Sequence, residues 1–281
     1  KTWAWAYALI APTIIGLCVL NIYPFFYTIY LSLLKYKGLG KPKFIGLANY
    51  AALPTLLTSL SVPLSRYIFN SVFVAVVTVV VHIFIASMAS FVLAKSDLKG
   101  RNILYWIVQF ALLYNAYTLA IPQYLIFTKM GIIDTLLVYI LPYLPSTLGV
   151  FLMKQYMDDS VPVALLEAAR IDGAGYFSIY FRIVMPLIKP AWLTLIIFSF
   201  QGLWNTGTNV LIQSEDLKTL TIFSEEMKTL PYVLSQVVSG GLARAGSAMA
   251  ATVLMMIPPI IVYLISQSNV METMSSAGIK D

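Results

Sequence analysis

Residues 155–190 read QYMDDSVPVALLEAARIDGAGYFSIYFRIVMPLIKP, a long polar stretch between two apolar blocks. Helix-forming residues run from 163 to 170. Ser160 is a suitable N-cap for this helix, and Pro162 is tolerated in its first turn. Gly173 can end the helix in a left-handed C-cap. The stretch is therefore predicted to begin with a short helix and a turn.

A second helix is predicted at 176–184, ending before Pro186. The small side chains of Ala168 and Ala169 would let another protein approach the first helix closely. Charged residues lie at the rim of that face: Arg170, Asp172 and Arg182. Periodicity alone leaves a second interpretation open, in which the stretch is an interfacial amphipathic hairpin.

The composition around this stretch is that of a membrane protein. The 281 residues are 59% hydrophobic and 11% charged, with a mean hydropathy of +0.83. A soluble domain carries about 25% charged residues, so these charges cannot cover a water-facing surface of this size. The single cysteine, Cys18, excludes an internal disulfide and a thiolate metal cluster.

Six apolar blocks are long enough to cross a bilayer, which takes about 20 residues. They lie at about 5–34, 68–94, 103–127, 136–153, 191–212 and 246–266. The predicted fold class is an all-α membrane protein with six transmembrane helices. Residues 1–281 are predicted to form a single transmembrane domain without a soluble domain, with the helix-turn-helix at 155–190 following the fourth span.

The second to fifth spans carry no Asp, Glu, Lys or Arg in their central regions. Ionisable residues inside a bilayer usually mark proton relays or ion pathways, so this argues against an ion-coupled carrier or a charge-ringed channel. His82 is the titratable exception, and we expect it to be neutral and bonded to a neighbouring helix.

The sequence contains no GxxxxGK[ST], HExxH, CxxC or GxSxG motif. We therefore expect neither an enzyme nor a metal site, and active transport would draw its energy from a separate chain.

The net charge of +6 raises the question of nucleic-acid binding. The basic residues are scattered over short loops, as is typical of membrane-flanking segments, so we expect no nucleic acid. With both termini cytoplasmic, nine Lys and Arg residues would lie inside and nine outside. The positive-inside rule therefore does not orient the chain.

The residues from 167 to 186 read Glu-Ala-Ala, three residues, Gly, nine residues, Ile, one residue, Met-Pro. This order resembles the EAA loop of importer-type ABC permeases, which ends in Leu-Pro. Met185 in place of Leu is the one departure, and it conserves volume. The run EAARIDGAG resembles the carbohydrate-uptake branch, and the six-span layout is similar to the smaller subunit of maltose-type permeases.

The resemblance implies the permease subunit of a type I ABC importer for a carbohydrate, in a bacterial or archaeal inner membrane. It places 155–190 and both termini in the cytoplasm. It implies a homologous permease, two ATPase subunits that bind ATP and Mg²⁺, an extracytoplasmic solute-binding protein and membrane lipid as partners. This chain itself would hold no cofactor. The coupling residues implied are Glu167, Ala168, Ala169, Arg170, Asp172, Gly173 and Pro186.

A path for sugars needs aromatic faces and side chains that bond hydroxyl groups. The candidates in the third span are Tyr114, Asn115, Tyr117 and Gln123, and those in the fifth are Gln201, Trp204, Asn205 and Asn209. These amides, phenols and indoles could instead bond to neighbouring helices or lie at the membrane interface.

Small residues begin the sixth span: Gly246, Ser247, Ala250 and Ala251. They predict a close helix contact, either with the partner permease or within this subunit. At the level of function, a permease for a non-sugar solute remains an alternative, as does a channel or secondary carrier with an accidental loop match.

Overall fold

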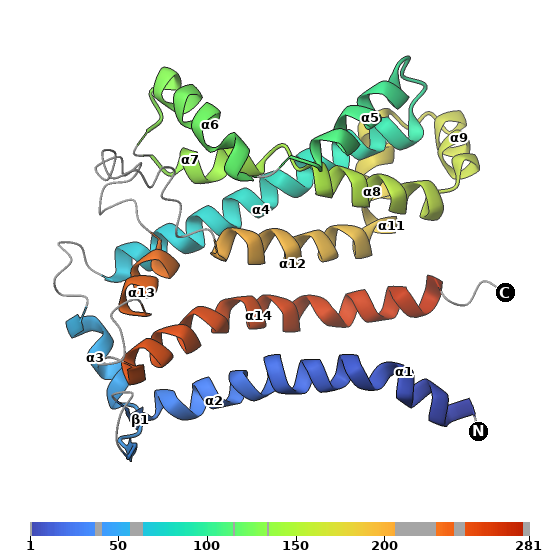
Figure 1. The fold of residues 1–281 in the computed structure, drawn as a ribbon. Coiled ribbons are helices and arrows are strands. Elements are labelled where there is room, and N and C mark those ends of the chain that lie inside the picture. Colours follow the sequence, from blue (N-terminus) through green and yellow to red (C-terminus); the bar gives the residue numbers. More distant parts are fainter. Residues whose placement is uncertain are drawn as a thin grey trace. The chain divides into compact units, whose positions relative to one another are not determined.

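The computed structural model describes residues 2–36, 41–56, 64–114, 116–133, 135–205, 229–238 and 245–277 (Figure 1). These residues are mostly helical. The chain divides into two compact units. The first unit comprises Lys1–Ser65 and Leu230–Pro258, and the second comprises Arg66–Thr229 and Pro259–Asp281.

The first unit opens with a long apolar helix. It consists of α1 (Thr2–Leu17), the π-helical turn η1 (Cys18–Ile22) and α2 (Tyr23–Ser32). The turn closes where the Tyr23 N–H donates to the Cys18 carbonyl, directly before Pro24. Proline has no N–H, and its ring clashes with the carbonyl four residues earlier. The widened turn accommodates Pro24 inside the helix.

A region held together by the Asn49 side chain, which we name the Asn49 clasp, follows this helix in the first unit. β1 (Leu34–Lys35) pairs antiparallel with β2 (Lys43–Phe44), and α3 (Ala48–Leu56) follows. The buried Asn49 amide donates to the Ser32 carbonyl at 2.7 Å and to the Leu34 carbonyl at 2.9 Å. The side chain of Asn49 thus satisfies two carbonyls where the chain turns.

The remaining elements of this unit are α13 (Leu230–Val238) and the first part of α14 (Ala245–Ala277). A Cβ on Gly246 would lie 2.5 Å from the Leu34 carbonyl oxygen, and Ala250 and Ala251 are fully buried. The close contact predicted for the small residues of the sixth span is therefore made, at Gly246, within this subunit.

The second unit is built on α4 (Leu64–Lys95), which belongs to it from Arg66. The elements that follow are α5 (Arg101–Ala111), α6 (Ala116–Met130), α7 (Leu137–Ile140), η2 (Leu141–Tyr143), α8 (Thr147–Ser160), α9 (Val163–Ile171), α10 (Tyr176–Ile179), η3 (Tyr180–Val184), α11 (Met185–Leu187) and α12 (Lys189–Asn205). Helix α8 packs beside both α5 and α12 (Figure 1). The core of this unit includes Ala86, Met153 and Leu195 from α4, α8 and α12.

His82 bonds three elements of the second unit together. Its Nδ1 lies 2.6 Å from the Tyr143 carbonyl oxygen, and its Nε2 lies 3.2 Å from the Ser199 hydroxyl. A carbonyl can only accept, so Nδ1 carries the proton, and a neutral ring then accepts at Nε2 from Ser199. The expectation of a histidine bonded to neighbouring helices is confirmed.

In the part of the chain that the structure describes, four helices are long and apolar enough to cross a membrane. They are Trp5–Ser32, Ser65–Lys95, Leu137–Ser160 and Ala245–Gln267. A fifth span arises if Tyr176–Leu187 and Lys189–Trp204, which meet at a bend of 76°, count as one.

The predicted continuous helix over 103–127 is corrected to two helices, α5 and α6. Helix α5 ends in a tightened turn. The backbone N–H groups of Leu112, Leu113 and Tyr114 donate to carbonyls three residues earlier, instead of four as in an α-helix. Hydropathy cannot reveal such a break, because the residues that make it are themselves apolar or aromatic.

Candidate functional site

The junction between α8 and α9 starts the segment that the sequence singled out. Ser160 is the last residue of α8 and Pro162 is the N-cap of α9, which corrects the predicted role of Ser160. Val161 between them is extended, with φ −112° and ψ 101°. The residue before a proline is driven towards this conformation, so Pro162 ends one helix and starts the next.

The second helical stretch does not end before Pro186, as predicted, but continues to Leu187 through η3 and α11. The Met185 N–H donates to the Tyr180 carbonyl and closes a π-helical turn directly before Pro186. This is the arrangement seen before Pro24, so in both places a widened turn lets proline sit inside a helix.

Gly173 ends α9 as its position predicts, with φ at +82°. The Gly173 N–H donates to the Arg170 carbonyl at 3.0 Å, and the Ala174 N–H donates to the Ala169 carbonyl at 2.9 Å. These two bonds form a Schellman motif, which needs a left-handed residue at Gly173. Open space surrounds the site of its missing Cβ, so the glycine is required by backbone conformation rather than by packing.

The inner face of α9 packs on a small core of its own, which we name the loop core. Its buried members are Met157, Val161, Leu166, Ala169, Ile179, Val184 and Ile188. Leu166 and Ala169 lie three residues apart and so share the inner face. Ala169 therefore packs inside the segment, whereas its neighbour Ala168 is exposed.

The exposed surface of α9 and α10, which we name the outer face, combines apolar and charged side chains. The apolar members are Val163, Leu165, Ile171, Tyr176 and Phe177, and the charged ones are Glu167, Arg170 and Asp172. Ile171 is 86% exposed, and the Arg170 guanidinium lies 5.4 Å from the centre of the Tyr176 ring. Exposed apolar groups rimmed by charges are typical of a surface that binds another protein.

The predicted coupling residues thus do not share one surface. Glu167, Ala168, Arg170, Asp172 and Gly173 are exposed around the turn that ends α9. Pro186 is also exposed but lies in α11, beyond the π-helical turn, and Ala169 is buried.

The segment joins α12 through a bend that the sequence did not reveal. The Trp192 indole N–H donates to the Met185 carbonyl at 3.1 Å across the 76° bend. The indole of Trp192 thus satisfies a backbone carbonyl at the bend. No pattern in the sequence pairs Trp192 with Met185.

The predicted substrate-path residues are only partly described. Asn115 and Asn209, and the side chains of Tyr117 and Asn205, lie outside the described part of the chain. Tyr114 is exposed and meets the Phe110 ring edge-on at 5.6 Å, and Gln123 on α6 is half-buried. Trp204 is buried and stacks on Phe200, with ring centres 5.6 Å apart.

Gln201 lines a hollow of about 230 Å³ between α12 and α14. The other lining residues are Ile197, Phe200, Pro259, Ile260 and Tyr263. An amide, a phenol and aromatic surface meet here, which is the chemistry that a sugar ring requires. Sequence analysis found Gln201 but missed Tyr263, because one tyrosine in an apolar span gives no signal by itself.

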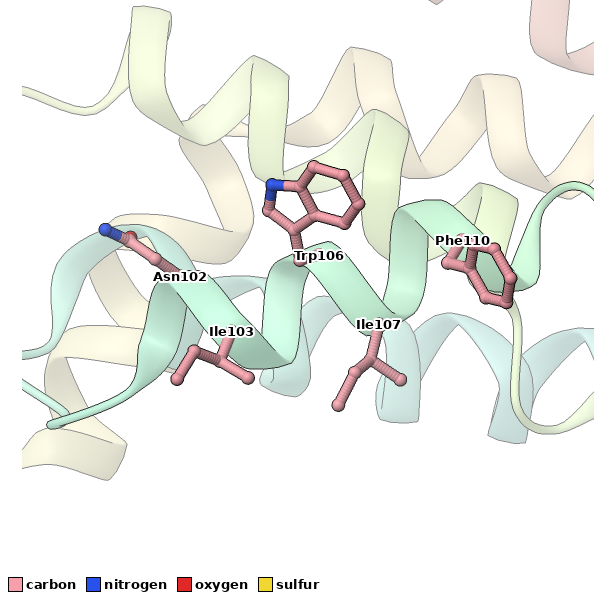
Figure 2. Close-up of a pocket in the computed structure, with 5 residues that line it drawn as sticks. All are labelled: Asn102, Ile103, Trp106, Ile107 and Phe110. Carbon is pink, nitrogen blue, oxygen red and sulfur yellow. The ribbon is translucent and has the colours of Figure 1, made fainter.

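A larger hollow, of about 480 Å³, runs along α5 (Figure 2). Its lining is Asn102, Ile103, Trp106, Ile107 and Phe110. Figure 2 shows Ile103 and Ile107 pointing to one side of the helix and Trp106 to the other. With one amide among large apolar side chains, this surface suits lipid tails or another apolar helix rather than a sugar.

Residues 82–275 match the family model described as "Binding-protein-dependent transport system inner membrane component". The chain is 32% identical over 215 residues to the arabinooligosaccharides transport system permease protein AraQ of Bacillus subtilis (strain 168), covering 76% of this chain and 73% of that protein. It is 28% identical over 272 residues to the polygalacturonan/rhamnogalacturonan transport system permease protein YtcP of the same organism, covering 90% and 89%.

Among solved structures, the fold is similar to a chain of a bacterial ABC transporter involved in the import of the acidic polysaccharide alginate. The TM-score is 0.67 at 16% identity, over 99% of this chain and 96% of that one. A second structure of a bacterial alginate ABC transporter, in complex with an alginate pentasaccharide-bound periplasmic protein, gives a TM-score of 0.65 at 14% identity, covering 93% and 92%.

Proposed function

Because the chain belongs to the family of binding-protein-dependent transport system inner membrane components, we propose that it is the permease subunit of an ATP-driven carbohydrate importer. It forms half of the translocation path, and a homologous permease forms the other half. An oligosaccharide is the substrate. The relatives support this class, since they are described as permeases for arabinooligosaccharides and for polygalacturonan and rhamnogalacturonan.

The observation that carries the proposal is the exposed outer face of α9 at the EAA position. Glu167 and Ala168 lie there beside apolar side chains such as Ile171. The loop core beneath packs against α9 and holds it in place, so the outer face is rigidly positioned. These features support docking of a cytoplasmic ATPase on this face.

In this importer two separate ATPase subunits bind ATP and Mg²⁺. The lack of a GxxxxGK[ST] motif in this sequence supports a separate site for ATP. Closure of the two ATPase subunits on ATP moves the segment 155–190, and the spans change between inward-facing and outward-facing states. ATP binding must favour one of two conformations for such coupling to work.

The segment 155–190 and both termini lie in the cytoplasm, and a solute-binding protein delivers the sugar from the other side. With Lys189 at the inner boundary, Gln201 lies twelve residues further along α12. At 1.5 Å per residue this is about 18 Å into a hydrocarbon layer about 30 Å thick. The hollow around Gln201 and Tyr263 therefore lies at mid-depth, where a translocating sugar would pass.

Co-purification of the ATPase with the tagged permease tests the proposal. We expect Glu167→Ala and Gly173→Arg to lose the ATPase while the permease stays in the membrane, because both alter the docking face. Asp159→Ala is the matched control, since Asp159 is exposed in the same segment but outside the motif. Unchanged ATPase recovery in both motif variants would refute the coupling role. Binding of a panel of oligosaccharides, and of amino acids and phosphate esters, to the solute-binding protein tests the substrate class.

A further inference from the structure

One side chain of the segment 155–190 is anchored in α4. Tyr180, at the start of η3, is 3% exposed, and its hydroxyl lies 2.6 Å from the Ser87 hydroxyl oxygen. Ser87 is fully buried in α4 and stands 93 positions earlier in the chain. A buried hydroxyl pair between distant elements is a specific contact, since either oxygen would lose its bond if the elements separated.

The direction of this bond follows from the neighbouring groups. The Ser87 hydroxyl also lies 3.0 Å from the Phe84 carbonyl oxygen, one turn back in α4. A carbonyl can only accept, so the serine proton goes to Phe84 and the Tyr180 phenol donates to Ser87. The result is a two-step chain from the phenol through the serine to the backbone of α4.

Aromatic rings also pack around the Tyr180 ring. The Tyr180 ring centre lies 6.3 Å from that of Phe84, 5.8 Å from that of Phe91 and 4.8 Å from that of Phe181. Phe84 also stacks on Phe181 at 6.1 Å. Rings at these separations attract one another, and the hydrogen bond between the buried Tyr180 and Ser87 side chains is stronger in their low-dielectric surroundings.

Tyr180 also holds the backbone of the segment. Its carbonyl accepts from the Met185 N–H and closes the π-helical turn before Pro186. Single π-helical turns are rare and frequently occur at functional sites. One residue therefore joins the irregular turn of the segment, through its carbonyl, to α4, through its phenol.

We propose that Tyr180 and Ser87 are positioning residues that pass movement of the segment 155–190 to α4. Helix α12 receives such movement directly, because the chain runs into it through the bend at Ile188. Helix α4 has no such covalent link and depends on contacts of this kind. The inference rests on the proposed function, in which an ATPase moves the segment.

The test uses the whole importer, reconstituted with its partner permease, ATPases and solute-binding protein. In Tyr180→Phe and Ser87→Ala, each variant loses one hydroxyl and keeps the aromatic packing. We expect ATPase co-purification and basal ATP hydrolysis to stay unchanged, and sugar transported per ATP to fall by about three- to tenfold, the range that one net hydrogen bond represents. The double variant should lose no more than either single variant, because both remove the same bond.

Tyr156→Phe is the matched control. Tyr156 packs half-buried against the same loop core, and no hydrogen bond of its phenol is present among the described residues. Its removal should leave transport per ATP unchanged. The inference is overturned if sugar transported per ATP is normal in Tyr180→Phe or in Ser87→Ala. It is also overturned if the losses of the two single variants add in the double variant. Failure of the unsubstituted chain to bind any ATPase would refute the proposed function instead.

Discussion

Gly173 has a backbone conformation that side chains with a Cβ rarely adopt, yet open space surrounds it. Gly173→Ala therefore introduces backbone strain without a clash. We expect the free energy of unfolding of the purified chain to fall by about 1 kcal/mol, measured by thermal or denaturant unfolding in detergent.

Gly175→Ala is the control for this prediction. Gly175 is two residues further on, also surrounded by open space, but its φ is −72°. Its replacement should leave the unfolding free energy unchanged within a few tenths of a kcal/mol. Equal effects of the two substitutions would show that the left-handed conformation is not what requires Gly173.

Gly246 has the opposite requirement, because a Cβ there would lie 2.5 Å from the Leu34 backbone oxygen. A backbone atom cannot rotate away, so Gly246→Ala must push α14 from the Asn49 clasp. We expect a loss of about 1–3 kcal/mol in unfolding free energy. Gly16→Ala, in an open helical position of the same unit, should instead be neutral or slightly stabilising. A harmless Gly246→Ala would contradict the packing described for the first unit.

These two glycines mark what single residues reveal in a sequence. Gly173 could be predicted, because helix formers precede it and the EAA spacing fixes its place. Gly246 appeared as a small residue near a span end, and the partner of its contact stayed open between two interpretations. The contact joins positions more than 200 residues apart, and spacing along one helix carries no information about such a pair.

At the scale of elements, the two faces of α9 give neighbouring alanines different roles. Ala168 is exposed on the outer face, whereas Ala169 packs in the loop core. We expect Ala168→Leu to leave the stability of the chain unchanged but to abolish ATPase co-purification, because the added bulk blocks close approach. Ala169→Leu should lower the unfolding free energy by about 1–3 kcal/mol through overpacking.

Measuring unfolding and ATPase co-purification on both variants separates the two roles. The assignment is contradicted if Ala168→Leu destabilises the chain as much as Ala169→Leu does. It is equally contradicted if Ala168→Leu retains the ATPase at the level of the unsubstituted chain.

The boundaries of helices were predicted well where the local backbone chemistry sets them. They were predicted poorly where contacts with distant parts of the chain set them. Helix 163–170 and its glycine stop follow from local propensity. The continuation through Pro186 does not, because the π-helical turn that precedes this proline is not visible in residue types. The division of 103–127 into α5 and α6 was likewise hidden inside an apolar run.

At the scale of the whole molecule, composition predicted the membrane class, but charge could not orient the chain. With nine basic residues on each side, the positive-inside rule favours neither orientation. The orientation depends instead on the EAA spacing and the family it indicates. The lack of Asp, Glu, Lys and Arg in the central regions of the predicted second to fifth spans led to the prediction that transport is not ion-coupled, and uptake measurements test this prediction.

The most direct test is oligosaccharide uptake into vesicles that contain the assembled transporter, with ATP supplied on the side of the segment 155–190. The account predicts that uptake requires ATP and the ATPase subunits and persists when a protonophore removes the proton gradient. Uptake without ATP, or uptake abolished by the protonophore while ATP hydrolysis continues, would contradict it.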